Sequence, residues 1–211
     1  MNKFLKNLLE RFPELTSLSG ELDHAFTMIK ETYEKEGTVF VCGNGGSAAD
    51  SEHIVGELMK GFVLKRPVKA EFRSRLAALY GEEGQKMANG LQEGLRAVAL
   101  TSHPALNTAF ANDVDGSMVF AQQVFVLGRP GDVFLGLSSS GNSVNVVKAL
   151  QIAKAKGLKT IAMTGENGGK CRGLADCLIN APHRETFRVQ EYHLPIYHTL
   201  CLMIEDCFYD C

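Results

Sequence analysis

The sequence predicts an α/β fold: a doubly wound sheet of five parallel strands flanked by helices, with additional helices at the N-terminus. Two observations lead to this prediction. Five short apolar runs of strand length alternate with segments of helical periodicity, which is the pattern of consecutive βα units. Two of these runs end in a loop rich in glycine or serine. Such loops are common at the carboxyl ends of parallel strands, where sheets of this kind bind their ligands.

The helical and apolar segments follow one another along the whole chain. Helices are expected over residues 2–11, 19–36, 47–60, 117–127, 144–156 and 186–207. Strands are expected over residues 38–42, 96–101, 132–137, 159–164 and 177–180, the last being the weakest run. The first run is continuously apolar and leads straight into glycines, as in a strand buried on both faces. Pro195 interrupts the last helical segment, so it either kinks that helix or marks where its regular part begins.

Residues 68–95 break the alternation of strands and helices. They carry no strand signal, and their apolar residues suggest two short helices on either side of Gly81-Glu82-Glu83-Gly84. The segment is too long to be a simple connection. We therefore expect an inserted helical hairpin within one domain that covers residues 1–211, in which residues 1–36 form the N-terminal helices.

Composition and charge limit the class of the protein. The 211 residues are 45% hydrophobic and 22% charged, with a formal net charge of −2, which indicates a folded domain rather than a disordered chain. The basic cluster at residues 65–69 is short and is soon followed by Glu71. We interpret it as a solvated connector, so no nucleic-acid partner is expected.

The N-terminus and the cysteines indicate the compartment. No apolar run approaches the roughly 18 residues of a membrane span, and the amphipathic N-terminus does not resemble a signal peptide. The six cysteines form no CxxC pair, and several lie in apolar runs. A cytoplasmic protein with free thiols and no membrane partner is therefore expected.

Both polar loops have the composition of an anion-binding site. Gly43-Asn44-Gly45-Gly46-Ser47 follows the first strand and opens a helix, where glycines allow a ligand to approach and the helix N-terminus favours an anion. It has neither GxGxxG nor Walker spacing, and it could instead be a tight turn capped by Ser47. Ser138-Ser139-Ser140-Gly141-Asn142-Ser143 offers four hydroxyls at a second helix start. A cap needs only one of them, so we favour a phosphate cradle.

Four other side chains point to proton transfer or to metal binding. His53 and Glu57 are four residues apart, and Gln190 and His198 are eight apart. Both spacings return to nearly the same face of a helix, so two helices could direct two groups each at one cleft. Such a set suits proton transfer on a sugar phosphate, and it could hold Zn²⁺ or a similar metal, although an amide is an uncommon zinc ligand. Taken singly, these residues could also be exposed helix positions or, for His198, a core histidine.

Taken together, these motifs resemble the sugar isomerase (SIS) domain proteins and, among them, the sedoheptulose-7-phosphate isomerases, also called phosphoheptose isomerases. The resemblance covers residues 31–66 and 96–206. The segments that carry it are Cys42-Gly43-Asn44-Gly45-Gly46-Ser47, His53, Glu57, Ala111-Asn112-Asp113, Ser138 through Ser143, Ile161 through Gly165, and Arg188-Val189-Gln190-Glu191 with His198.

The resemblance implies the SIS fold and a homotetramer with sites at subunit interfaces. It implies isomerisation of sedoheptulose 7-phosphate to D-glycero-D-manno-heptose 7-phosphate through an enediol, for heptose and surface-glycan biosynthesis. By matching motif, Glu57 is implied as general base and His198 as general acid. The implied zinc ligands are His53, Glu57, Gln190 and His198. The implied substrate contacts are Asn44, Gly45, Gly46, Ser47, Glu57, Asn112, Asp113, Ser138, Ser139, Ser140, Ser143 and Gln190.

Two alternatives belong to other functional classes. Some related SIS tetramers bind a replication initiator and lack the catalytic carboxylate, whereas Glu57 is present here. SIS domains also sense sugar phosphates in transcription regulators, but no helix-turn-helix region accompanies this domain. The hairpin at residues 68–95 departs from typical members of the family. It leaves the identity of the sugar open, and it could cover the site or enlarge an oligomer interface.

Overall fold

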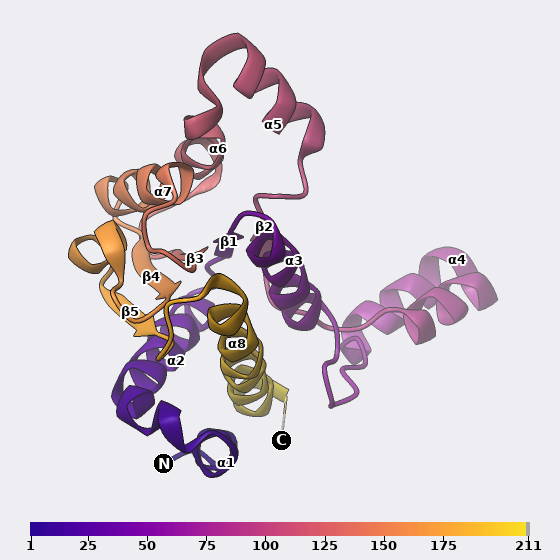
Figure 1. Ribbon diagram of the computed structural model, residues 1–211. Coiled ribbons are helices and arrows are strands. Elements are labelled where there is room, and N and C mark those ends of the chain that lie inside the picture. Colours follow the sequence, from indigo (N-terminus) through magenta and orange to yellow (C-terminus); the bar gives the residue numbers. More distant parts are fainter. Residues whose placement is uncertain (210–211) are drawn as a thin grey trace.

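Five parallel strands form the centre of the protein (Figure 1). The computed structural model describes residues 1–209. The strands are β1 (Val39–Cys42), β2 (Ala97–Ala99), β3 (Val133–Ser138), β4 (Lys159–Thr164) and β5 (Cys177–Asn180). They lie in the order β2-β1-β3-β4-β5, and every neighbouring pair is parallel. The order reverses between β1 and β3, and sheets with this order bind ligands at that switch point.

Helices cover both faces of the sheet. One face carries α1 (Lys3–Arg11), α2 (Ser19–Glu34), α3 (Gly46–Met59) and α8 (Thr186–Tyr209), and the other carries α6 (Val119–Leu127) and α7 (Val144–Ala155). Shorter helical pieces are η1 (Pro13–Leu18), α5 (Pro104–Phe110), the π-helical turn η2 (Ala111–Asp115), η3 (Gly116–Met118) and η4 (Gly169–Gly173). In Figure 1, α3 and α8 lie side by side next to the sheet, and they are also in contact.

The alternation of side chains along each strand divides the core into two layers. In β1, Val39 and Val41 pack in the layer of α2, α3 and α8. Phe40 and Cys42 pack in the layer of α6 and α7. All four residues are buried. Burial on both faces explains why the sequence of this strand is continuously apolar rather than alternating.

The predicted elements are confirmed, with ends that differ by at most two residues. The sequence pattern does not indicate α5 or the short turns up to Met118. This stretch is short, and its apolar residues do not recur at helical spacing. Pro104 at the first helical position was a usable start signal. The idea that regular helix begins only after Pro195 is wrong, because α8 is one helix on both sides of it.

The segment between α3 and β2 forms the predicted helical hairpin. Helical structure runs through α4 (Ala70–Gly90), but the backbone reverses at Gly81, which has φ 55° and ψ −131°. The guanidinium of Arg73 donates a hydrogen bond to Asn89 Oδ1, 16 residues further along. In a straight helix these residues would be about 24 Å apart, so the two halves fold back on each other. Figure 1 shows the hairpin projecting from the body of the protein.

The structure describes five of the six cysteines. Free thiols are found at Cys42, Cys171, Cys177 and Cys201, which are buried, and at Cys207, which is exposed. Cys211 lies outside the described residues. Within residues 1–209, no helix combines the length and the apolar character needed to cross a membrane.

Candidate active site

The two polar loops meet at the switch point of the sheet. Asn44 in the loop after β1 and Asn145 at the start of α7 exchange two hydrogen bonds, each amide nitrogen donating to the other's Oδ1 at 2.9 Å. Gln190 of α8 lies against the first loop, because a β-carbon placed on Gly46 would be only 2.6 Å from its Nε2. The structure therefore gathers the predicted substrate-binding loops and Gln190 in one place. Asn145 belongs to this group, although the sequence analysis did not single it out.

The first loop is shaped by glycine. Gly45 is the N-cap residue of α3, with φ 55° and ψ −122°. Residues other than glycine rarely adopt this conformation. Gly43 passes so close to the next turn that a β-carbon would lie 2.4 Å from the Ser47 carbonyl oxygen. The alternative in which Ser47 caps the helix is wrong. Ser47 is buried within the first turn, and its carbonyl accepts a hydrogen bond from Ser51 Oγ at 2.7 Å.

Hydrogen bonds among the serines fix the second loop. Ser138 Oγ donates to Ser143 Oγ at 2.9 Å, and the Ser143 amide donates back to Ser138 Oγ at 3.3 Å. Ser140 Oγ accepts from the Asn142 amide at 3.2 Å, and Ser139 Oγ lies 3.3 Å from Thr186 Oγ1. The Ser143 side chain makes no capping hydrogen bond at the start of α7. The Val146 amide donates to Asn145 Oδ1 at 3.0 Å, so the positive end of the helix is only partly satisfied within the chain and favours an anion.

The proposed acid and base lie together between α3 and α8. Nε2 of His53 is 3.2 Å from Oε1 of Glu57, whose side chain is only 12% exposed. The rings of His53 and His198 are 5.0 Å apart. Nε2 of His198 is buried and has no hydrogen-bond partner. A buried, unsatisfied nitrogen is costly, and it is available to a substrate hydroxyl.

Three neighbours that the sequence analysis missed support this cluster. Nζ of Lys60 pairs with Oε2 of Glu57 at 2.8 Å. The Tyr197 hydroxyl lies 3.0 Å from Nδ1 of His53 and donates to Oδ1 of Asp50 at 3.2 Å. The Lys60 contact could have been expected from its spacing of three residues on one helix. The contact between Tyr197 and His53 joins two helices, so no local sequence pattern predicts it.

Burial sets the protonation of His198. Desolvation lowers the pKa of its ring below the ordinary value, and repulsion from His53 lowers it further, while the carboxylate of Glu57 opposes the shift. His198 is therefore neutral near pH 7. Desolvation also raises the pKa of Asp50, and the hydrogen bond from Tyr197 partly offsets this.

The phosphate loops and the acid–base cluster are separated along both helices. Glu57 follows Gly46 by 11 residues on α3, and His198 follows Gln190 by eight on α8. These spacings correspond to about 16 Å and about 12 Å along the helix axes. Gln190 borders the first loop, whereas His53, Glu57 and His198 gather further along the two helices. Helical periodicity fixes the direction of a side chain but not its distance along the axis.

Three of the four predicted zinc ligands gather in one place. These are His53, Glu57 and His198, and Gln190 precedes His198 by eight residues on α8. In the part of the chain that the structure describes, no three His, Cys, Asp or Glu side chains are arranged to hold a metal. The contact between Lys60 and Glu57 also places a cation where a metal would compete for the carboxylate.

Asn112 and Asp113 lie outside both clusters as far as their own contacts show. They are exposed on the π-helical turn η2, where Asn112 Nδ2 donates to Asp113 Oδ1 at 2.8 Å. An ion pair between Lys148 of α7 and Asp115, at 3.0 Å, ties this turn to the helix that starts at the serine loop.

Known proteins resemble the chain over most of its length. The SIS domain family model matches residues 3–75 and 91–165. A phosphoheptose isomerase of Akkermansia muciniphila is 32% identical over 99% of each chain. One from Helicobacter pylori strain P12 is 37% identical over 92% of this chain and 88% of its own. The structure of a phosphoheptose isomerase from Neisseria gonorrhoeae is 33% identical, with a TM-score of 0.73 over 96% of this chain and 91% of its own.

The hairpin stands apart from the general pattern of the family. The family model passes over residues 76–90, which lie inside the hairpin. The A. muciniphila protein nevertheless matches nearly end to end, so its chain has room for a segment of the same length. With its five parallel strands, its two polar loops and a match over most of its length, the chain belongs to the SIS-domain family of phosphoheptose isomerases.

Proposed function

We propose that the protein interconverts sedoheptulose 7-phosphate and D-glycero-D-manno-heptose 7-phosphate by moving the carbonyl group between C2 and C1. One observation carries the proposal. Glu57, a nearly buried carboxylate, and the neutral ring of His198 both lie next to His53. The names of the relatives support the same reaction class. The product suits the biosynthesis of heptose-containing surface glycans.

Glu57 acts as the general base. It removes a proton from C1 of the ketose, the C2 oxygen gains a proton, and the cis-enediol forms. Loss of the proton on the C1 oxygen and return of a proton to C2 then give the aldose. The ion pair with Lys60 holds one oxygen of Glu57 and leaves Oε1 facing His53. General acid–base catalysis of this kind contributes a factor of about 10²–10⁴ to the rate.

His198 moves protons between the two substrate oxygens. Its lowered pKa keeps the ring neutral, so it has one nitrogen that donates and one that accepts. A neutral imidazole can therefore give a proton to one oxygen and take a proton from its neighbour. Nε2 of His198 is buried and has no hydrogen-bond partner among the described residues.

The two polar loops provide the phosphate site. Serine hydroxyls and the starts of α3 and α7 favour a dianion. Gln190 and the Asn44–Asn145 pair border the same place. A cradle without a fixed cation binds a phosphate and still lets the product leave.

We further propose that each complete site combines parts of two copies of the chain in a cytoplasmic homotetramer. Glu57 starts about 16 Å from Gly46, and its side chain can lean back by about one turn of 5.4 Å. From C1 through the ester oxygen to phosphorus the extended substrate spans roughly 10 Å, at about 1.5 Å per bond. The remaining distance within one chain, about 11 Å, is at the limit of this span, and a second copy packed against the cleft would bring a base and a cradle closer together.

Proton exchange in D₂O tests the reaction. Wild-type protein incubated with sedoheptulose 7-phosphate should place deuterium on the carbon beside the carbonyl and produce aldose signals in NMR. Glu57→Gln should abolish both while leaving the fold intact. Glu52→Gln is the matched control, because it changes an exposed carboxylate on the same helix. Absence of exchange in the wild type would favour another sugar phosphate or a non-catalytic binding protein.

Mixing two inactive variants tests the shared site. Ser140→Asp places a carboxylate in the cradle and should block phosphate binding, and Glu57→Gln removes the base. If the two parts come from different copies, tetramers that contain both variants regain activity at some of their sites. If one chain holds a complete site, the mixture stays as inactive as its components.

Zinc is a separate prediction. Metal analysis of the purified wild type and of His53→Ala tests it. Stoichiometric zinc that is lost with His53 would support the prediction. A metal-free, fully active wild type would reject it.

A further inference from the structure

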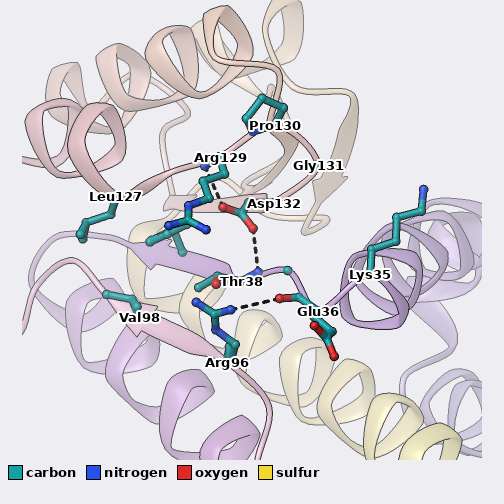
Figure 2. Close-up of a pocket in the computed structure, with 12 residues that line it drawn as sticks. Lys35, Glu36, Thr38, Arg96, Val98, Leu127, Arg129, Pro130, Gly131 and Asp132 are labelled. Carbon is teal, nitrogen blue, oxygen red and sulfur yellow. Dashed lines mark hydrogen bonds between the residues drawn. The ribbon is translucent and has the colours of Figure 1, made fainter.

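A second hollow lies at the opposite edge of the sheet from the serine loop. Figure 2 shows it between residues that immediately precede strands: Thr38 before β1, Arg96 before β2 and Asp132 before β3. It therefore opens at the amino ends of these strands, whereas the phosphate loops follow their carboxyl ends. The cavity volume of about 410 Å³ is in the range of small-molecule sites.

Two arginines at this hollow lack anionic partners. Arg96 and Arg129 are exposed and come from different segments of the chain. Nη1 of Arg96 donates to the carbonyl oxygen of Glu36 at 3.2 Å. Within residues 1–209, the guanidinium of Arg129 takes part in no hydrogen bond or ion pair, and neither arginine pairs with a carboxylate. Like charges that share a cavity repel each other, and a bound anion removes that repulsion.

The carboxylates at the hollow do not neutralise the arginines. Asp132 is buried, and its two oxygens accept hydrogen bonds from the backbone amides of Thr38 and Arg129, both at 2.8 Å. The side chain of Glu36 points away from both guanidinium groups in Figure 2. The hollow therefore presents positive charge to a ligand.

The other wall of the hollow is apolar. Phe40 and Val98 come from neighbouring strands, and Leu127 at the end of α6 is 44% exposed. Inorganic phosphate alone would leave Leu127 in water. A ligand that joins an anionic group to an apolar group would use both walls.

The walls are held in place before any ligand arrives. Thr32 of α2 accepts a hydrogen bond from the Gly37 amide at 2.9 Å through its carbonyl, and its Oγ1 donates to the Gly131 carbonyl at 2.9 Å. The Gly131 amide donates to the Gly157 carbonyl at 3.0 Å. One threonine thus ties the segment before β1 to the segment before β3, and a rigid site loses less entropy on binding.

We propose that this hollow binds a small organic phosphate with an apolar or aromatic group, of the class of a nucleoside monophosphate. Arg96 and Arg129 hold the phosphate, because a guanidinium matches two phosphate oxygens at once. Val98 and Leu127 pack against the apolar group. The site is separate from the acid–base cluster, so its occupation does not depend on the reaction proposed above.

Calorimetric titration with adenosine 5′-monophosphate tests the proposal. The wild type should bind it, and Arg96→Gln and Arg129→Gln should each weaken binding by about tenfold or more. Lys35→Gln is the matched control: it removes a positive charge at the rim from a side chain that points away from the arginines in Figure 2. Both arginines are exposed, so the variants should fold and keep the basal isomerase activity.

Binding at the serine loop must be told apart from binding at this hollow. Ser140→Asp should abolish turnover but leave the binding of adenosine 5′-monophosphate unchanged. Inorganic phosphate should bind more weakly than the nucleotide, and equal affinity would overturn the role of the apolar wall. No binding by the wild type at millimolar nucleotide would overturn the proposal. Binding that survives both arginine substitutions would overturn it too, as would arginine variants that change only the oligomeric mass.

Discussion

The Tyr197 hydroxyl on α8 lies 3.0 Å from Nδ1 of His53 on α3. It donates its only proton to Oδ1 of Asp50 at 3.2 Å, so its oxygen accepts the Nδ1–H of His53. The other ring nitrogen, Nε2, is 3.2 Å from Glu57 Oε1. The position of Tyr197 therefore fixes which ring nitrogen of His53 faces the general base.

Replacing Tyr197 by phenylalanine should lower kcat/KM by on the order of tenfold, because it frees the ring of His53 beside Glu57. The substitution also removes the hydrogen bond that Asp50 accepts from Tyr197, and this loss should destabilise the fold by about 1–3 kcal/mol. Steady-state kinetics over a range of pH and urea unfolding measure the two effects. Tyr192→Phe is the control. Tyr192 is on the same helix as Tyr197, and its exposed hydroxyl donates a hydrogen bond to Glu14. Equal kinetics for both variants would show that Tyr197 has no part in positioning His53.

The sheet could be predicted because local sequence determines it. A continuous apolar run such as residues 39–42 can be buried on both faces only in a covered parallel sheet, and its period does not suit an exposed strand. The meeting of the two loops follows from the same rule, since carboxyl ends of parallel strands share an edge. The structure adds the bond between Asn44 and Asn145, which depends on how α7 is rotated.

The acid–base cluster shows where prediction from sequence ends. The spacing of His53 and Glu57 on one helix correctly indicated a contact. The spacing of Gln190 and His198 gave the same face of α8 but could not show that Gln190 borders the first loop while His198 lies near His53. Contacts such as Tyr197 with His53 depend on the packing of α3 against α8, which no single helix determines.

Replacing Glu205 by glutamine should destabilise the protein by about 3–5 kcal/mol, because it leaves Arg66 buried without its anion. Both side chains are 1% exposed and lie 2.8 Å apart. Burial raises the pKa of Glu205, but backbone amides of Val63 and Phe62, together with Arg66, outweigh it and hold the pKa below its usual value. The carboxylate thus fixes the loop that leads into the hairpin.

Asp206→Asn is the matched control for Glu205. Asp206 pairs at 2.6 Å with Lys3, whose side chain is 61% exposed, and exposed pairs contribute only about 0–1 kcal/mol. Urea unfolding at neutral pH compares the two variants. A loss of under about 1 kcal/mol for Glu205→Gln would mean that the buried carboxylate is not needed in its charged form.

Stability should fall as the pH drops below about 6.5, with His193 as one cause. Burial lowers the pKa of this histidine to about 4, although the Thr164 carbonyl opposes the shift. Its Nε2 lies 3.3 Å from that carbonyl, and its Nδ1 is buried without a partner. Because the unfolded chain binds the proton more readily, stability is full above the unfolded pKa and is lost as the pH falls toward 4.

The expected contribution of His193 between pH 7.5 and pH 5.0 is roughly 2 kcal/mol, at about 1.4 kcal/mol per pH unit below 6.5. Urea unfolding at both pH values measures it in the wild type and in His193→Asn. The variant should lose correspondingly less stability on acidification. An identical loss in both proteins would assign the acid sensitivity to other groups.

Removing the hairpin should change the assembly or the substrate range. Its exposed apolar side chains are Phe72, Leu79, Tyr80, Met87 and Leu91. A surface of this kind usually meets a partner or covers a site. The ends of the hairpin are already joined, because Pro67 and Gln92 form an antiparallel bridge and the Glu93 amide donates to the Arg66 carbonyl at 2.7 Å. Residues 69–90 can therefore be replaced by a Gly-Asn turn without separating the strands on either side.

Sedimentation analysis gives the mass of the shortened protein, and kcat/KM on heptulose and shorter ketose phosphates gives its substrate range. A smaller assembly would place the hairpin between copies of the chain. An unchanged mass with a broader range would place it over the site. Leu79→Ser is the matched control within the hairpin, because it removes one exposed apolar side chain and keeps the length. If mass and substrate range are both the same as in the wild type, the hairpin serves neither purpose.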